Sequence, residues 1–307
     1  MRQMCADGVR VQMCVTSPPY YRLRDYGVEG QIGFEDSPEE YVDTLVEVFD
    51  CVRDLLADDG VLWLNLGDSY NNSDKWGGGG ANTGKHSKDE NGKVPSWSGV
   101  RRKWKGLSGT KPKDLLGIPW RVAFALQAAG WYLRQDIIWH KPNPMPESVR
   151  DRCTKAHEYL FLLAKSERYY FDHKAMQEPE TMKPQNRLTP RKANPNAKVH
   201  GMPAYRQQEG GTGGGMRNRR SVWTIPTRPY KGAHFATFPP ALIEPCILAG
   251  SRPGDIVLDP FMGSGATAEV AVLNHRRYLG CELNQDYAPL QDERVDKAAA
   301  LLFTDLL

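Results

Sequence analysis

The chain has 307 residues, of which 40% are hydrophobic, and carries a formal net charge of +3, so it is long enough for one large α/β domain with an inserted lobe or for two domains. No apolar run approaches the roughly 18 residues that a membrane span needs, and no signal pattern opens the chain, so a cytoplasmic protein without membrane contact is expected. The six cysteines form no C-x-x-C pair and the seven histidines lack metal-ligand spacing, which predicts a reduced compartment and no metal site.

The first predicted strand, residues 9–15, leads into the stretch Thr-Ser-Pro-Pro-Tyr-Tyr. Its residues alternate as strand residues do, and Pro18 and Pro19 end it because neither has an N–H to donate to a sheet. Ligands of open α/β sheets bind beyond the carboxyl ends of the strands, and this stretch places the Ser17 hydroxyl and the Tyr20 ring there.

This stretch suits the chemistry of a nucleobase amino group. The Ser17 side chain and the Pro18 carbonyl can accept its two N–H groups, which directs the nitrogen lone pair toward an electrophile. Tyr20 can stack on the base, a contact worth roughly 1–3 kcal/mol. A turn that ends the strand and buries the tyrosine explains the same residues equally well.

The next two elements are structural. Ser37–Glu40 predicts a helix start, with the serine as N-cap and a proline at the first position. A turn at Asp59-Gly60 leads into a strand at Val61–Leu66, whose near-continuous apolar run is typical of a parallel strand buried on both faces. Asp68 and Tyr70 follow its carboxyl end, where they either line a pocket or cap loops.

Two stretches are strongly basic. Asn71–Lys113 carries ten basic residues against three acids, and Met182–Arg220 carries nine against Glu209 alone. A solvated loop explains either stretch by itself, but two of them around a motif for base chemistry favour contact with DNA phosphates.

Regular structure is predicted to resume with a helix at Pro119–Ala129 and strands at Trp131–Trp139 and His157–Ala164. The two strands are expected to be antiparallel neighbours joined by the loop Lys141–Thr154. Residues 165–222 have the character of a variable insert.

The dipeptide Pro245-Cys246 falls inside a predicted helix, Pro240–Ala249. A Pro-Cys nucleophile is used by cytosine-C5 methyltransferases, but a buried structural cysteine is the favoured interpretation at a mid-helix position.

The last part of the chain predicts a ligand-binding turn. A strand at Asp255–Asp259 leads through Pro260–Gly265 into a helix at Ala266–Leu273, and glycines in such a turn let the backbone approach a ligand closely. The following strand, Arg277–Glu282, ends in an acid 17 positions after the turn, a spacing that suits a carboxylate on ribose hydroxyls. An amphipathic helix at Asn284–Phe303 closes the chain.

Five motifs resemble those of the amino-group DNA methyltransferases, which methylate N6 of adenine or N4 of cytosine. They are Val15–Tyr20, Leu23–Gly27, Trp63–Tyr70, Trp139–Asn143 and Asp259–Gly265. Their order, with the catalytic motif first and the cofactor motif last, is that of the β class. The family usually places a strand and a Gly-Asp turn ahead of the first motif's strand, whereas residues 1–8 precede it in this sequence.

The resemblance implies a doubly wound, Rossmann-like α/β sheet, mostly parallel with an antiparallel hairpin, and an inserted target-recognition region. It divides the chain into a catalytic half at residues 1–164, with a basic loop at 71–113, a target-recognition insert at 165–222, and a cofactor-binding half at 223–307.

The resemblance also implies the reaction. A methyl group passes from S-adenosylmethionine to the amino nitrogen of a base flipped out of duplex DNA, without a covalent intermediate, in an enzyme of a restriction-modification system that is expected to be a homodimer. The serine form of the first motif is typical of the cytosine enzymes, but the longer motifs are shared with adenine enzymes, so both target bases stay open.

The site residues that the resemblance implies fall into three groups. The catalytic residues are Ser17, Pro18, Pro19 and Tyr20. Contacts with S-adenosylmethionine are expected from Thr16, Phe235, Thr237, Asp259, Pro260, Phe261, Gly263, Ser264, Gly265, Thr267, Glu282 and Asn284. DNA contacts are expected from Tyr21, Trp139, Lys141, Asn143, Arg101, Arg102, Lys103, Arg187, Arg191, Lys192, Arg217, Arg219 and Arg220, although Trp139 suits a core position equally well.

The sequence leaves three alternatives open. The enzyme acts on an amino or amide group of RNA or protein, the chain is a catalytically silent DNA-binding regulator, or the glycine turn serves a nicotinamide-dependent oxidoreductase. The two basic stretches favour a nucleic acid over a protein, the intact Ser-Pro-Pro-Tyr motif argues against the regulator, and an oxidoreductase has no evident use for the basic stretches.

Overall fold

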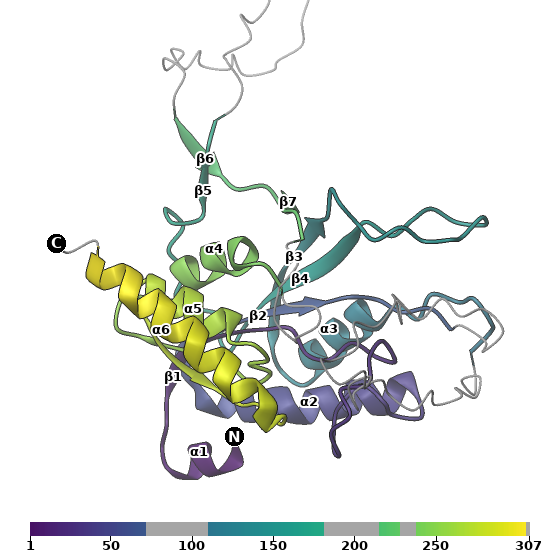
Figure 1. Cartoon of the computed structure of the whole chain (residues 1–307), viewed down its shortest axis with the longest axis horizontal. Helices are drawn as coiled ribbons and strands as arrows, with labels where there is room; N and C mark the ends of the chain where they lie inside the picture. The colour runs from purple at the N-terminus through teal and green to yellow at the C-terminus, as the bar shows by residue number, and fades with distance from the viewer. Residues whose placement is uncertain (72–109, 181–214, 228–237, 305–307) are drawn as a thin grey trace, which may run out of the picture.

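The computed structural model of the chain describes residues 1–71, 110–180, 215–227 and 238–304. Helices lie on both faces of a central sheet, and a small hairpin rises from one end (Figure 1). The strands are β1 Val11–Thr16, β2 Leu56–Leu66, β3 Tyr132–His140, β4 His157–Ala164, β5 Gln177–Pro179, β6 Met216–Asn218, β7 Val222–Thr224, β8 Ile256–Asp259 and β9 Arg277–Gly280. The helices are α1 Arg2–Ala6, α2 Pro38–Leu55, α3 Ile118–Ala128, α4 Pro240–Gly250, α5 Ala266–Leu273 and α6 Ala288–Thr304, with a 3-10 turn, η1, at Gln285–Tyr287.

The main sheet has seven strands in the order β7-β3-β4-β2-β1-β8-β9. Within the described part of the chain, β4 is the one strand that runs antiparallel to its neighbours β2 and β3, and every other pair in this sheet is parallel. The predicted fold class, a mostly parallel sheet with one antiparallel hairpin, is therefore confirmed. The strands predicted at Trp131–Trp139 and His157–Ala164 correspond to β3 and β4, and they pair antiparallel as expected. The carboxyl end of β1 therefore lies between the carboxyl ends of β2 and β8.

Each face of the sheet has its own core. The Leu62 and Leu64 side chains of β2 pack in one core with α2 and α3, while Val61 and Trp63 pack in another with α4 and α5. Because side chains of a strand alternate between faces, one apolar run supplies both cores. The Ser37 side chain caps α2 as predicted, accepting a hydrogen bond from the Glu40 N–H.

The structure differs from the sequence prediction between α2 and β2. Instead of a turn at Asp59-Gly60, the helix passes directly into β2, whose register against β1 is irregular between its Leu56 and Val61 positions. The change of direction falls at the C-cap of α2, Leu56, whose backbone is already extended.

The predicted insert 165–222 contains residues that pack with the main body at both ends. The Tyr170 N–H donates to Asp59 O, the Asp172 N–H donates to Ala249 O, and β7 joins the main sheet beside β3. What rises from the body is the short hairpin β5–β6, held by an ion pair between Arg217 and Glu178 (Figure 1).

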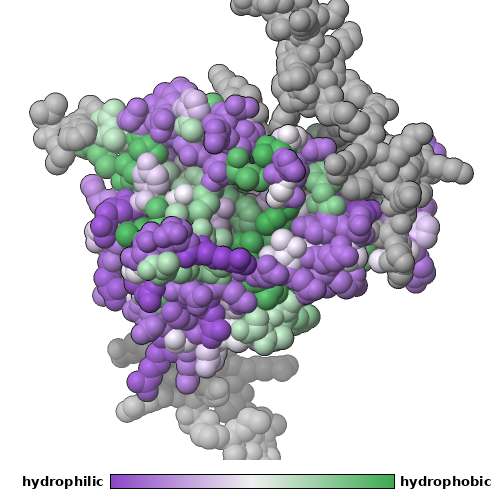
Figure 2. Space-filling model, turned by 90° about the horizontal axis from the view of Figure 1, so that it is seen from below, coloured by the Kyte–Doolittle hydropathy of each residue, from purple (hydrophilic) through white to green (hydrophobic). Residues whose placement is uncertain are grey.

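No helix within the described ranges is long and apolar enough to cross a membrane. Seen from below, hydrophilic residues cover most of the described surface, and hydrophobic residues gather in the middle of the view (Figure 2). Cys246 lies in α4, fully buried, and burial raises the pKa of its thiol, which confirms the structural interpretation of this cysteine.

Candidate active site

The end of β1 is joined to the end of β8 by a buried carboxylate. The Thr16 hydroxyl donates to Asp259 Oδ1 at 2.6 Å, the Thr267 hydroxyl donates to Oδ2 at 2.6 Å, and the Phe261 N–H donates to Oδ1 at 3.0 Å. Two motifs separated by more than 240 residues therefore share one hydrogen-bonded group. The joint fixes the Ser-Pro-Pro-Tyr stretch relative to the glycine turn.

Burial dominates the electrostatics of this joint. Asp259 is 1% exposed, and desolvation raises its pKa to about 6, although the hydroxyls of Thr16 and Thr267 and the Phe261 N–H each act to lower it. The charge of Glu282 adds to the rise. The carboxylate form is retained only because three donors surround it.

The glycine turn after β8 is held by α6. Gly265 has φ +82°, a left-handed conformation that side chains rarely adopt, and it packs against Gln291. The Gln291 side chain donates to Gly263 O at 2.7 Å, and Arg294 donates to the Ser264 hydroxyl at 2.9 Å. The C-terminal helix therefore fixes the backbone conformation of the turn.

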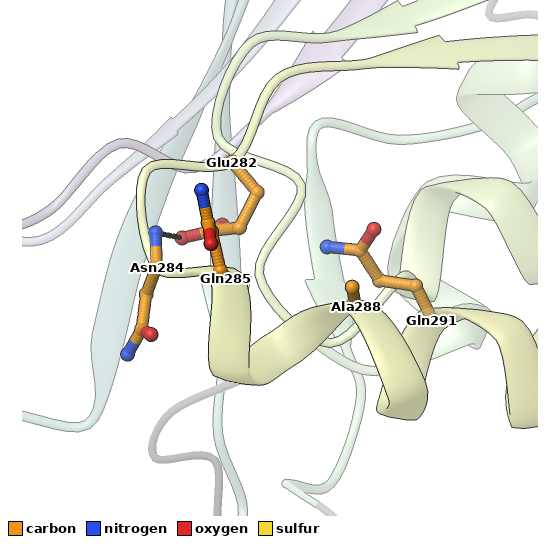
Figure 3. Close-up of a pocket in the computed structure, with 5 residues that line it drawn as sticks. All are labelled: Glu282, Asn284, Gln285, Ala288 and Gln291. Carbon is orange, nitrogen blue, oxygen red and sulfur yellow. Dashed lines mark hydrogen bonds between the residues drawn. The ribbon is translucent and has the colours of Figure 1, made fainter.

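A pocket of about 510 Å³ opens beside this turn, lined by Glu282, Asn284, Gln285, Ala288 and Gln291 (Figure 3). Glu282 lies just after β9, and its carboxylate accepts the Gly263 N–H at 2.7 Å and the Asn284 N–H at 2.8 Å. Both bonds leave lone pairs on the two oxygens, so the carboxylate can still accept hydroxyl groups of a ligand. This polar lining next to a glycine turn fits the ribose of S-adenosylmethionine.

Tyr20 is anchored through its hydroxyl group. This hydroxyl donates to Glu158 Oε2 at 2.6 Å and lies 3.1 Å from Asn65 Oδ1, while the Ser17 hydroxyl donates to it at 3.4 Å. Burial, and then the charge of Glu158, raise the pKa of Tyr20 well above its usual value. Tyr20 is partly exposed, so a fixed and neutral ring borders the site.

Hydrogen bonds from two other elements also hold the backbone of the Pro-Pro stretch. The Tyr41 hydroxyl of α2 donates to Pro19 O at 2.8 Å, and the Ser69 hydroxyl donates to Tyr21 O at 2.8 Å. Among the described residues, none donates a hydrogen bond to Pro18 O. The backbone of the stretch is therefore fixed on the carboxyl side of Pro18.

Asp68 caps a helix. Its Oδ1 accepts the N–H groups of Ile118, in the first turn of α3, and of Ser69, and its other oxygen lies 3.7 Å from Lys155 Nζ. Burial lowers the pKa of Lys155, and Asp68 partly offsets that effect. Of the two interpretations left open by the sequence, the structure supports loop capping for Asp68.

Two residues predicted to contact DNA have their side chains in the core, which for Trp139 is the alternative that the sequence left open. Tyr21 has no exposed surface, and its hydroxyl donates to Glu35 O at 3.2 Å. Trp139 is 3% exposed, and its indole N–H donates to Ile225 O at 2.9 Å. A base cannot reach either ring in this structure.

Other predicted DNA-contacting residues already have protein partners. Lys141 pairs with Glu158 and lies over the Trp139 ring, and the Asn143 side chain exchanges two hydrogen bonds with the Thr227 backbone. Arg219 lies over the Trp223 ring at 4.2 Å. Arg220 is exposed next to it.

Several residues predicted to contact the cofactor have buried side chains that bond to other protein groups. The side chains of Thr16, Thr267 and Asp259 are buried and bond to one another, so in this structure they hold the site from inside. Ser264 is 1% exposed and is bonded to Arg294. Pro260, Phe261 and the glycines form the turn itself, and the remaining predictions, for Arg101, Arg102, Lys103, Arg187, Arg191, Lys192, Phe235 and Thr237, lie outside the described residues.

The sequence prediction missed the residues that hold the predicted ones. Asn65 and Glu158 bond to Tyr20, and Gln291 and Arg294 fix the glycine turn. One signal was present, because Asn65 is a polar residue inside the apolar run of β2. Glu158 carried no comparable signal, because an acid near the start of a strand is common on surfaces.

Comparison with known proteins gives the family. Residues 11–293 match the family described as DNA methylase. The Type II methyltransferase M.SmaI of Serratia marcescens is 47% identical over 282 residues, which cover 92% of this chain and 82% of that protein. M.Cfr9I of Citrobacter freundii is 45% identical over 285 residues, which cover 93% of this chain and 81% of that protein.

Solved structures share the fold at lower identity. The cytosine-N4-specific PvuII DNA methyltransferase has a TM-score of 0.58 at 18% identity and covers 96% of this chain and 86% of its own. M1.HpyAVI in complex with S-adenosylmethionine has a TM-score of 0.51 at 17% identity and covers 95% of this chain and 93% of its own.

Together with the sheet and the two joined motifs, these matches define an S-adenosylmethionine-dependent transferase. The chain belongs to the DNA methylase family, and it transfers the methyl group to an exocyclic amino nitrogen of DNA, N6 of adenine or N4 of cytosine. The matches do not favour the RNA, protein, regulator or oxidoreductase alternatives.

Proposed function

We propose that Ser17 and the Pro18 carbonyl accept the amino group of the target base and that Tyr20 stacks on the ring. The observation that carries this proposal is the joint through Asp259, because it sets the Ser-Pro-Pro-Tyr stretch beside the glycine turn. Bound S-adenosylmethionine supplies an electrophilic methyl group. The chain's own contribution is then to hold the base and aim its lone pair, so positioning provides most of the rate enhancement.

The cofactor contacts are proposed for Glu282, Asn284 and the backbone of the glycine turn. Glu282 is held by two backbone N–H groups, and this leaves its carboxylate oriented toward the pocket for ribose hydroxyls (Figure 3). The target base would reach Ser17 only after leaving the duplex, because its amino group is otherwise paired and stacked.

We propose N4 of cytosine as the target, supported by the serine form of the motif at Ser17. Duplex DNA incubated with the enzyme and methyl-labelled S-adenosylmethionine, then digested to nucleosides, is expected to yield N4-methylcytosine by mass spectrometry. N6-methyladenine would contradict the choice of base while leaving the amino-group mechanism in place. 5-Methylcytosine would overturn both.

Gly67 is expected to be essential for the position of Tyr20. A Cβ at this position would lie 2.4 Å from Tyr20 Cε2, and the ring cannot retreat without losing its bond to Glu158. Gly67→Ala is therefore expected to lower the single-turnover rate about 10²-fold, since a shift of about 1 Å in a reacting group has that effect. Rapid-quench measurement with S-adenosylmethionine at saturation checks this.

Gly215→Ala is the matched control, because a Cβ there meets nothing closer than Glu180 Oε2 at 3.5 Å. Calorimetry should give both variants the cofactor affinity of the wild type. A Gly67→Ala enzyme that keeps the wild-type rate would show that Tyr20 tolerates displacement.

Contacts with DNA phosphates and the oligomeric state are also proposed. The two basic stretches and the described arginines near the hairpin, Arg217, Arg219 and Arg220, supply phosphate contacts on either side of the target. We propose a homodimer, which the family resemblance implies, and a cytoplasmic location, which the lack of a signal pattern in the sequence favours.

A further inference from the structure

A carboxylate lies two hydrogen bonds away from Ser17. The Ser17 hydroxyl donates to the Tyr20 oxygen at 3.4 Å, and the Tyr20 hydroxyl donates to Glu158 Oε2 at 2.6 Å. Tyr20 has one proton to give, and a charged carboxylate is a stronger acceptor than the amide oxygen of Asn65 at 3.1 Å. The chain of bonds therefore runs in one direction, from Ser17 through Tyr20 to Glu158.

Glu158 ends this chain of hydrogen bonds and is in contact with solvent. It is near the start of β4, next to the carboxyl end of β2, and its side chain is 15% exposed, so it has contact with solvent. Lys141 pairs with its other oxygen, Oε1, and Asn65 Nδ2 lies 3.4 Å from Oε2. Tyr20 remains a neutral hydroxyl, because burial and Glu158 both raise its pKa, and a neutral hydroxyl can accept one proton as it gives another.

The reaction requires a proton acceptor. An amino nitrogen that forms a bond to the methyl carbon becomes cationic and has to lose one of its protons. A serine hydroxyl cannot retain that proton, since it has no basic group of its own. Two other carboxylates of the described chain are engaged elsewhere, Asp259 in the buried joint and Asp68 at the start of α3.

We propose that Glu158 receives the proton that the target amino group loses, delivered through Ser17 and Tyr20, an inference that rests on the proposed role of Ser17. The bond from methyl carbon to sulfur breaks as the bond to nitrogen forms, and the electron pair stays on sulfur. The amino proton passes to Ser17 Oγ, the Ser17 proton to Tyr20, and the Tyr20 proton to Glu158. One positive and one negative charge disappear together, so the net charge of the site does not change.

The test separates proton transfer from mere positioning of Tyr20. Glu158→Gln keeps an oxygen that accepts the Tyr20 hydroxyl but cannot take up its proton. It is expected to lower kcat about 10²-fold, in the range of general base catalysis, with the KM values for DNA and S-adenosylmethionine unchanged. Tyr20→Phe should lower kcat similarly, and the double variant should be no slower than either single one, because the residues act as one chain.

Glu293→Gln, which alters an exposed ion pair with Lys297 on α6, is the matched control and should keep the wild-type kcat. A Glu158→Gln or Tyr20→Phe enzyme within threefold of the wild-type kcat would overturn the inference, and if Glu158→Gln does not fold, Tyr20→Phe decides alone. Ser17→Ala distinguishes failure of the proton path from failure of the proposed function. If it loses turnover while these variants keep theirs, the proposed function stands without the proton path, and if it keeps turnover, the proposed function itself fails.

Discussion

Ser17→Ala is expected to lower the turnover number about 10²–10³-fold, the usual effect of removing one hydrogen-bonding group that acts on charge developing in the transition state. The side chain is partly exposed at the end of β1, and within the described residues it bonds to Tyr20 alone. Its loss therefore leaves the joint at Asp259 and the pocket around Glu282 as they were. The affinity for S-adenosylmethionine, measured by calorimetry, should stay within twofold of the wild type.

Ser166→Ala is the matched control for this variant, because it removes a hydroxyl that donates to Asp58 O on an exposed turn. In single-turnover assays on the same DNA, Ser166→Ala should keep the wild-type rate, whereas Ser17→Ala should be slower by about 10²–10³-fold. The opposite pattern for Ser17→Ala, lost cofactor affinity with turnover kept, would contradict the assigned roles.

The sequence was sufficient for the elements that bury continuous or alternating apolar runs. β1 and β4 were predicted close to their observed bounds, as were the start of α2 and the end of β2, since periodicity reports which face of an element is buried. The three-residue strands β5, β6 and β7 were not predicted. A strand of three residues is too short to show a hydrophobic alternation in the sequence. β7 is a strand because it pairs with the edge of β3.

The motifs of the site could be predicted from the sequence, but the residues that hold these motifs in place could not. Tyr20 and Tyr21 are adjacent in sequence, yet one borders the site and the other is core, because consecutive side chains after β1 point in different directions. Glu158 is 138 residues from Tyr20, and only the placement of β4 beside β2 brings the two together. A sequence cannot show such contacts when the residues lack a shared motif.

Asp259 is expected to make the stability of the protein depend on pH between about 4 and 6. Burial raises its pKa to about 6 in the folded protein, against 3.8 for the ordinary group, so the folded state binds the proton more tightly than the unfolded state. The free energy of unfolding that this group contributes is therefore greatest below pH 3.8 and falls as the pH rises to 6. At about 1.36 kcal/mol per pKa unit, the fall is about 3 kcal/mol.

Urea unfolding of the wild type and of Asp259→Asn, in steps from pH 4 to pH 7, measures this effect as the difference between the two curves. Asparagine does not titrate, so the stability of the wild type relative to Asp259→Asn should decrease by about 2 kcal/mol between pH 4 and pH 7, most of the full effect. Asp43→Asn, at an exposed position of α2, is the matched control, and its difference from the wild type should change far less, because water solvates that carboxylate in both states. A flat difference for Asp259→Asn would mean that the three donors offset the burial of the carboxylate, and that the joint between β1 and β8 holds its charge at no cost to stability.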